Sequence, residues 1–197
     1  MLLTDTHTHL YYETDEEKQE LLFQRCFENH VNRLFLPNVD LSSIPKIDDL
    51  VRKYPDHCFA MSGLHPCDVK EGYTEILAEI YRSIEGRKIY AIGEIGIDLY
   101  WDKSTLGIQR AAFREQIKWA KALGLPIVIH CREAFDEVFE ILEEEKGELL
   151  RGILHCFTGN LAQAQKTIEL GFYLGIGGVV TYKKAGLDEV LSHIPLE

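Results

Sequence analysis

The sequence lacks the features that mark membrane-spanning and disulfide-rich secreted proteins. No apolar run approaches the roughly 18 to 20 residues that a membrane-spanning helix needs. The N-terminal segment MLLTDTH lacks the basic and apolar regions of a signal peptide. The five cysteines form no CxxC pair and are odd in number, which argues against a disulfide framework. We therefore expect a cytoplasmic protein that does not associate with membranes.

The chain also lacks an excess of positive charge. Lysine and arginine together number 21 against 32 aspartates and glutamates, so the net charge is −11. This balance argues against a general nucleic-acid coat protein, which usually has a basic face. It does not exclude an enzyme that binds nucleic acid through the local charge of a metal. With 46% hydrophobic residues in 197, the chain can form one substantial core.

A strand pattern followed by a helix pattern recurs along the chain. The expected strands are 2–6, 33–38, 57–64, 89–96, 127–129, 152–155 and 172–176. Apolar residues at helical spacing follow each strand, for example Ile47, Leu50, Val51 and Tyr54, with Ser43 as a candidate N-cap. Seven such units in alternation predict a parallel sheet covered by helices, and they favour a barrel over an open sheet.

The length of the chain bears on how much of a barrel it contains. An eight-fold barrel usually takes about 250 residues. This chain ends at Glu197, where an eighth strand should begin. We therefore predict a (β/α)8 TIM-type barrel truncated before strand eight. Residues 1–197 are expected to form this C-terminally incomplete barrel as a single domain.

Ligand-type residues occur near the ends of four expected strands. His7 and His9 are two apart after the first strand, which places both imidazoles on one face. Glu94 lies in an apolar run, and His130 and His155 close strands five and six. Taken singly, each also fits a structural role: a loop histidine pair, a buried ion pair with Arg132, or core histidines. Together they occupy the face on which such barrels build active sites.

The chemistry of this set indicates divalent metal ions. Four imidazoles and a carboxylate suit Zn²⁺, Mn²⁺, Ni²⁺ or Co²⁺ better than Mg²⁺, which prefers mostly oxygen ligands. Five ligands exceed the three protein ligands typical of a single catalytic zinc. Two ions that share Glu94 are therefore expected. Such a pair can activate water at neutral pH and stabilise the oxygens of a phosphoryl centre.

Five motifs in order resemble those of the TatD-like metal-dependent deoxyribonucleases, within the amidohydrolase superfamily. They are DTHTHL at 5–10, GLHP at 63–66, GEIGID at 93–98, PIVIHCREA at 126–134 and HCFTG at 155–159. The resemblance implies that His7 and His9 bind one metal, that His130 and His155 bind the other, and that Glu94 bridges them as the catalytic carboxylate. It also implies a phosphodiester substrate, with DNA hydrolysis as the activity.

The chain departs from the family pattern at three places. Tyr11 stands where the family often has an aspartate, and Cys67 stands where a histidine often follows the His-Pro pair. We expect both changes to tune the site. The family's last metal ligand, an aspartate on strand eight, would lie beyond Glu197. The chain is therefore expected to bind its two metals unequally and to have weak or no activity.

Further residues are candidates for supporting roles. The resemblance implies that His65 contacts substrate, while Arg132 either contacts phosphate or pairs with a carboxylate. Asp98 is expected to orient a ligand histidine, as metal-bound histidines usually require. Cys131 and Cys156 each follow a ligand, so strand alternation should turn them away from the metals and into the packing. In loops on the active face, three aromatic residues either stack nucleobases or cover the rim: Tyr100, Trp101 and Tyr182.

The leading functional hypothesis is a deoxyribonuclease or other phosphodiesterase that uses two divalent metals to activate water. The expected partner is DNA or another phosphodiester, with no obligate protein partner. Two alternatives stay open. One is an amidohydrolase-type enzyme that acts on a small amide, lactone or phosphoester, because fold does not fix function. The other is a catalytically inactive, truncated fragment.

Overall fold

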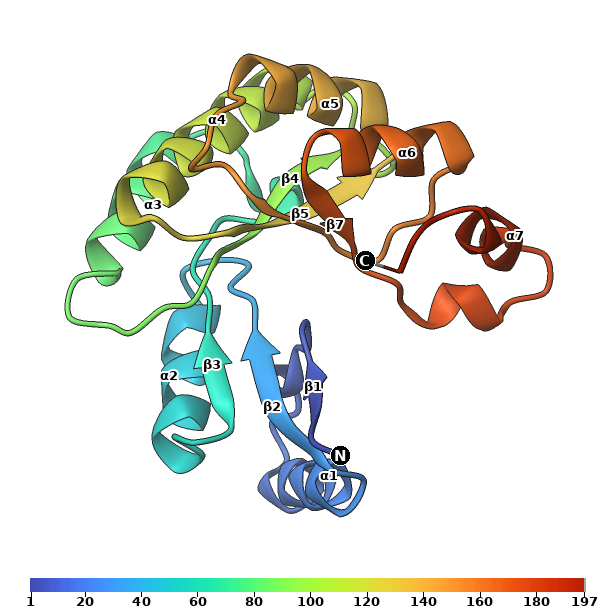
Figure 1. Cartoon of the computed structure of the whole chain (residues 1–197). Coiled ribbons are helices and arrows are strands. Elements are labelled where there is room, and N and C mark those ends of the chain that lie inside the picture. Colours follow the sequence, from blue (N-terminus) through green and yellow to red (C-terminus); the bar gives the residue numbers. More distant parts are fainter. Residues whose placement is uncertain (197) are drawn as a thin grey trace.

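Strands and helices alternate along the computed structural model, which describes residues 1–196 (Figure 1). Within these residues the strands are β1 (Leu3–Asp5), β2 (Val31–Leu36), β3 (Cys58–Ala60), β4 (Ile92–Asp98), β5 (Ile127–Arg132), β6 (Gly152–Leu154) and β7 (Phe172–Leu174). The α-helices are α1 (Glu16–Glu28), α2 (Ser43–Lys53), α3 (Tyr73–Ser83), α4 (Leu106–Leu123), α5 (Phe135–Glu144), α6 (Leu161–Glu169) and α7 (Leu187–Ser192). The predicted alternation of seven β/α units is confirmed.

All strand pairs are parallel and follow chain order. One sheet has the order β1-β2-β3 and the other has the order β4-β5-β6-β7. A parallel bridge between Ser62 and Ile92 joins the two sheets, and the Gly93 amide donates to the Ser62 carbonyl at 2.9 Å. The strands thus form one barrel-like series. Among the described residues no pairing joins β1 to β7, so the barrel is not closed there.

The helices cover the outer side of this series. In Figure 1, α3 to α6 lie along the second sheet, whereas α1 and α2 flank the first. Phe113 and Ile117 of α4 are fully buried in the same core as Ile95 and Ile97 of β4. This burial of a helical stripe against a buried strand is what the apolar spacing predicts. Among the described helices, none is both long and apolar enough to cross a membrane.

The structure corrects several expected boundaries. Strand four extends to Asp98 and strand five to Arg132, so Glu94 and His130 lie within strands instead of at their ends. The two strands can pair this far because Gly96 has a φ of 139° and a Cβ there would clash with the His130 carbonyl. The third strand is shorter than expected and ends at Ala60.

The assignment of Ser43 as an N-cap is wrong. Ser43 is the first residue of α2, and its hydroxyl donates to Asn38 Oδ1 at 2.9 Å. The Ser43 amide instead donates to Asp40 Oδ1 at 2.8 Å. The N-cap of α2 is Ser42, the residue before Ser43, and spacing alone could not choose between two adjacent serines.

Candidate metal centre

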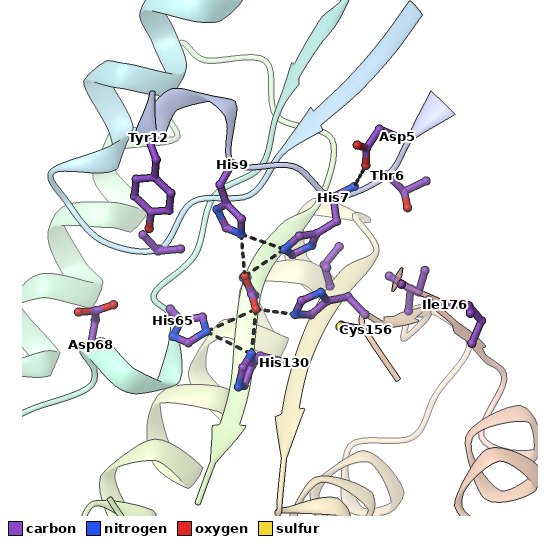
Figure 2. Close-up of a pocket in the computed structure, with 17 residues that line it drawn as sticks. Asp5, Thr6, His7, His9, Tyr12, His65, Asp68, His130, Cys156 and Ile176 are labelled. Carbon is purple, nitrogen blue, oxygen red and sulfur yellow. Dashed lines mark hydrogen bonds and ion pairs between the residues drawn. The ribbon is translucent and has the colours of Figure 1, made fainter. Parts of the chain in front are cut away.

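The predicted ligand residues converge on one cavity of about 520 Å³ (Figure 2). His7 and His9 follow β1, and His155 directly follows β6. His130 projects from β5 and Glu94 from β4. Parallel strands bring these positions to one side of the sheet, although they are far apart in sequence. The cavity also contains His65, which precedes the short 3-10 helix η2 (Pro66–Asp68).

Five imidazole nitrogens surround the carboxylate of Glu94, which is only 3% exposed. Around Oε1 lie His155 Nε2 at 2.6 Å, His130 Nδ1 at 2.9 Å and His65 Nε2 at 3.4 Å, and around Oε2 lie His7 Nε2 at 3.2 Å and His9 Nε2 at 3.5 Å. His130, His155 and His65 thus lie around one oxygen of Glu94, and His7 and His9 lie around the other.

This donor set fits divalent cations. His7 Nε2 lies 3.1 Å from His9 Nε2, so at least one of these nitrogens directs a lone pair into the cavity. His7 Nδ1 is buried without a hydrogen-bond partner among the described residues. The ligand atoms of His7, Glu94 and His155 all lie within 4.8 Å of one another, and so do those of His65, Glu94 and His130. By distance alone, His155 therefore groups with His7. Zn²⁺ and similar divalent transition-metal ions prefer such a set, in which imidazole nitrogens surround one carboxylate.

The electrostatics of the cluster keep the carboxylate ionised. Burial by itself raises the pKa of Glu94, but hydrogen bonds from His130, His155, His65 and His7 outweigh it and hold that pKa well below its usual range. Burial also lowers the pKa of His130, yet Glu94 and Asp98 together raise it above its ordinary value. For His155 burial prevails, assisted by His7 and His130, and its pKa is lowered. His155 is therefore the more readily neutral of these two candidate ligands.

A second carboxylate, that of Asp98, contacts the ring nitrogen of His130 that does not face Glu94. Asp98 Oδ2 lies 2.7 Å from His130 Nε2. Its other oxygen, Oδ1, accepts from the backbone amides of Tyr100 at 3.0 Å and Trp101 at 3.2 Å. A carboxylate can only accept, so His130 carries a proton on Nε2, while its Nδ1 lies 2.9 Å from Glu94 Oε1. The predicted orienting contact of Asp98 is present, and it also connects His130 to the loop after β4.

Tyr11 likewise contacts the ring nitrogen of His9 that does not face Glu94. Its hydroxyl donates to the Pro37 carbonyl at 2.7 Å, and His9 Nδ1 lies 2.7 Å from the same hydroxyl. Burial raises the pKa of Tyr11, so it remains a neutral phenol with a single proton. That proton goes to Pro37, so the hydroxyl accepts from His9 Nδ1–H. The lone pair of His9 Nε2 is left facing the cavity.

His65 has the opposite arrangement. The Cys67 amide donates to His65 Nδ1 at 3.2 Å, so the Nδ1 lone pair is occupied. Neutral His65 then has its proton on Nε2, and that N–H points at Glu94 Oε1 and His130. Proximity groups His65 with the candidate ligands, but the Cys67 amide makes it a hydrogen-bond donor. Burial, with Asp98 adding, raises the pKa of the Cys67 thiol to about 12, so this side chain stays neutral.

The side chains that directly follow the candidate ligands lie in different surroundings. Cys156 does not pack inward as expected: it is exposed, lines the cavity and has a φ of 47°. Because β6 already ends at Leu154, strand alternation does not extend to Cys156. Cys131 does pack against the main core. Arg132 forms no ion pair with Glu94; its guanidinium carbon lies 3.7 Å from the ring centre of Tyr100.

The fold and this histidine–carboxylate cluster define a hydrolase of the metal-dependent barrel class. The sequence model of the family described as TatD related DNase matches residues 4–197. The chain belongs to this family. It is 40% identical over 195 residues to a protein of Bacillus subtilis named "Uncharacterized metal-dependent hydrolase YabD", and the match covers 98% of this chain and 76% of that protein.

Other relatives and solved structures agree with this assignment. A protein of Edwardsiella piscicida named "3'-5' ssDNA/RNA exonuclease TatD" is 32% identical over 175 residues, which is 88% of this chain and 67% of that protein. The crystal structure of YJJV, a TatD homologue from Escherichia coli K12, superposes with a TM-score of 0.90 at 28% identity. The superposition covers 98% of this chain and 75% of that one. A TatD family hydrolase of Entamoeba histolytica, at 22% identity and a TM-score of 0.81, supports the fold alone.

Proposed function

We propose that this chain hydrolyses phosphodiester bonds of DNA or a related nucleic acid with two divalent ions. His7 and His9 would hold one ion, His130 and His155 the other, and Glu94 both. One observation carries the proposal: a buried carboxylate has histidine nitrogens on each of its two oxygens. Relatives named as single-stranded DNA/RNA exonucleases support nucleic acid as the substrate.

When bound, the metal pair lowers the pKa of a coordinated water and neutralises charge on a phosphoryl group. The residues of the chain fix where this happens. Glu94 stays ionised and central because four histidines hydrogen-bond to it. Tyr11 and Asp98 would each accept the proton of one ring nitrogen of His9 and His130, which leaves the other nitrogen of each ring to bind an ion in the cavity. The site is therefore organised before substrate arrives, so little binding energy is spent on arranging it.

Two residues outside this set are assigned to substrate. His65 donates its Nε2 proton in a hydrogen bond to a non-bridging phosphate oxygen, since its Nδ1 is already occupied by the Cys67 amide. Arg132 contacts phosphate further along the strand. No carboxylate of the described residues lies within ion-pair distance of it. A guanidinium offers several donors in the planar geometry that phosphate oxygens accept.

The identity of the ions follows from the same ligands. Imidazole nitrogens favour Zn²⁺, Mn²⁺, Ni²⁺ or Co²⁺ over Mg²⁺. We also propose a cytoplasmic location, which the five free cysteines support.

The test is to strip the protein with a chelator and reload it with one metal at a time. Metal content is then measured together with hydrolysis of a single-stranded oligonucleotide, a small chromogenic phosphodiester, and a lactone and an amide. We expect about two ions per chain, bound unequally, and weak turnover of both phosphodiesters. Turnover of the lactone or the amide alone would overturn the proposal in favour of amidohydrolase chemistry.

A matched pair of variants separates metal binding from substrate binding. His9→Ala removes a free ring nitrogen and should lower metal content. His65→Ala removes a donor and should raise KM while metal content stays the same. Equal loss of metal in both variants would show that His65 is a ligand, as its proximity alone would suggest.

A further inference from the structure

We propose that Tyr100, Trp101 and Arg132 form a subsite for a nucleobase and its phosphate, on single-stranded nucleic acid. This inference rests on the proposed function and extends it beyond the histidine cluster. The three residues lie in the loop after β4 and at the end of β5. None of them lines the cavity around Glu94, so the subsite is separate from the metal centre.

The geometry of the three side chains is that of a stacking platform. The guanidinium carbon of Arg132 lies 3.7 Å from the ring centre of Tyr100 and 5.6 Å from that of Trp101. The two aromatic rings meet edge to face, with centres 4.8 Å apart and planes at 88°. Trp101 is nevertheless 70% exposed and Tyr100 48%. The platform therefore leaves open aromatic surface, and base–aromatic stacking needs such surface.

The guanidinium of Arg132 supplies the positive charge of the platform. Two arginines of α4 pair with carboxylates of α5, Arg110 with Glu140 and Arg114 with Glu144. Within residues 1–196, by contrast, no carboxylate lies within 4 Å of the guanidinium of Arg132 or the ammonium of Lys70. Lys70 lines a small hollow with Trp101, but Asp98 and Asp102 line it too, so the charges in that hollow offset one another. Arg132 is therefore the cation of the platform that is available to a phosphate.

The position of the platform links it to the metal centre. Arg132 is two residues after His130 on β5, so strand alternation places both side chains on one face. Asp98 pairs with Arg132 in the strand register. The same Asp98 side chain contacts His130 with one oxygen and the amides of Tyr100 and Trp101 with the other. A nucleic-acid strand that stacks on Tyr100 and Trp101 would therefore be held at a fixed position relative to His130.

The two tryptophans of the chain make this inference directly measurable. Trp101 is 70% exposed and Trp119 only 6%, so a ligand on the platform quenches the first and leaves the second. The experiment titrates the metal-stripped full chain with a single-stranded oligonucleotide, and with an otherwise identical abasic one, while tryptophan fluorescence is recorded. We expect quenching by the normal oligonucleotide and binding about tenfold weaker for the abasic one, which is within what one base stack contributes.

Variants sharpen the test. With the fluorescence anisotropy of a dye-labelled oligonucleotide as the readout, Trp101→Ala should weaken binding about tenfold. Arg132→Gln should reduce the slope of log K against log salt by roughly 0.7, the value for one phosphate on a single strand. Tyr81→Ala, an exposed aromatic of α3, is the control and should change neither. Unchanged affinity in Trp101→Ala, or equal affinity for the abasic strand, would overturn the proposal.

The failure of this inference can be told from failure of the proposed function. Turnover of the small chromogenic phosphodiester by the unaltered, metal-loaded protein tests the function alone. Turnover without any oligonucleotide binding at Trp101 would leave the hydrolase and remove the subsite. Binding at Trp101 without turnover of any phosphodiester would keep the subsite and remove the proposed activity.

Discussion

The strands β1 and β4 both supply the central cluster, but they are built in opposite ways. β1 has three residues, all exposed, and pairs on one side with β2. β4 has seven residues, all buried, and lies inside the series of strands. His7 and His9 therefore follow a short, exposed edge strand, whereas Glu94 lies on a strand whose residues are all buried. The half of the site with His130 and His155 (the protected half) is therefore fixed by the core, and the half with His7 and His9 (the edge half) is fixed by local hydrogen bonds.

The residues that hydrogen-bond to the candidate ligands also differ between the two halves, in their charge. Asp98, a carboxylate, holds His130 on the protected side. Tyr11, a neutral phenol, holds His9 on the edge side. A charged partner raises the basicity of a ligand histidine more than a neutral one, and outer partners affect metal affinity strongly. We therefore expect the ion at His130 and His155 to be bound more tightly than the ion at His7 and His9.

The largest effect should come from the residue that both halves share. Glu94→Gln keeps the size of the side chain but removes the negative charge among the histidines. We expect phosphodiesterase kcat/KM to fall by about a thousandfold or more, where each tenfold corresponds to roughly 1.4 kcal/mol of transition-state stabilisation. Metal content should fall in both halves together. Loss of a single ion, measured by elemental analysis, would contradict the bridging role.

The next effect concerns stability and tests the contrast between the strands themselves. Ile97→Ala in β4 removes a fully buried side chain and should lower the free energy of unfolding by about 2 to 5 kcal/mol. Leu3→Ala in β1 changes a side chain that is already 39% exposed and should cost about 0.5 kcal/mol. Urea unfolding of the metal-stripped chain measures both values. Similar costs at the two positions would refute the picture of a protected and an edge strand.

Removing the carboxylate partner should affect the protected half more than the edge half. Asp98→Asn cannot accept the His130 proton as strongly, so that site should lose about 10- to 100-fold in metal affinity. Calorimetric titration of the stripped chain with Zn²⁺ resolves the two sites if they differ. The prediction requires that the weaker site, assigned to His7 and His9, keep its affinity. A uniform weakening of both would mean that Asp98 acts on the fold as a whole.

The smallest effect is expected at the phenol. Tyr11→Phe keeps the ring but leaves His9 Nδ1 without its acceptor, so the tautomer with a free Nε2 is less favoured. A neutral hydrogen bond contributes about 0.5 to 1.5 kcal/mol, so metal affinity at His7 and His9 should fall about three- to tenfold. Tyr54→Phe is the control, because Tyr54 packs on Phe23 in the same core and contacts no candidate ligand. The ¹⁵N shifts of His9 report its tautomer without any assay of activity. An unchanged tautomer in Tyr11→Phe would refute the assignment.

The sequence by itself determined the alternation of strands and helices and the set of residues in the cluster. Apolar spacing is a local property, so it locates α4 and β5 without knowledge of their neighbours. Histidines and a glutamate near the ends of parallel strands must meet at one face, so His7, His9, Glu94, His130 and His155 could be assembled from spacing and motif order.

Only the tertiary structure decided what each ring nitrogen does. The Cys67 amide turns His65 into a donor, and the Pro37 carbonyl turns the Tyr11 hydroxyl into an acceptor for His9. Arg132 lies over Tyr100 instead of pairing with Glu94. Hydrogen-bond roles depend on which groups lie within about 3 Å in space, and a backbone carbonyl or amide has no signature in the sequence. The residue types were therefore predictable, and their protonation and partners were not.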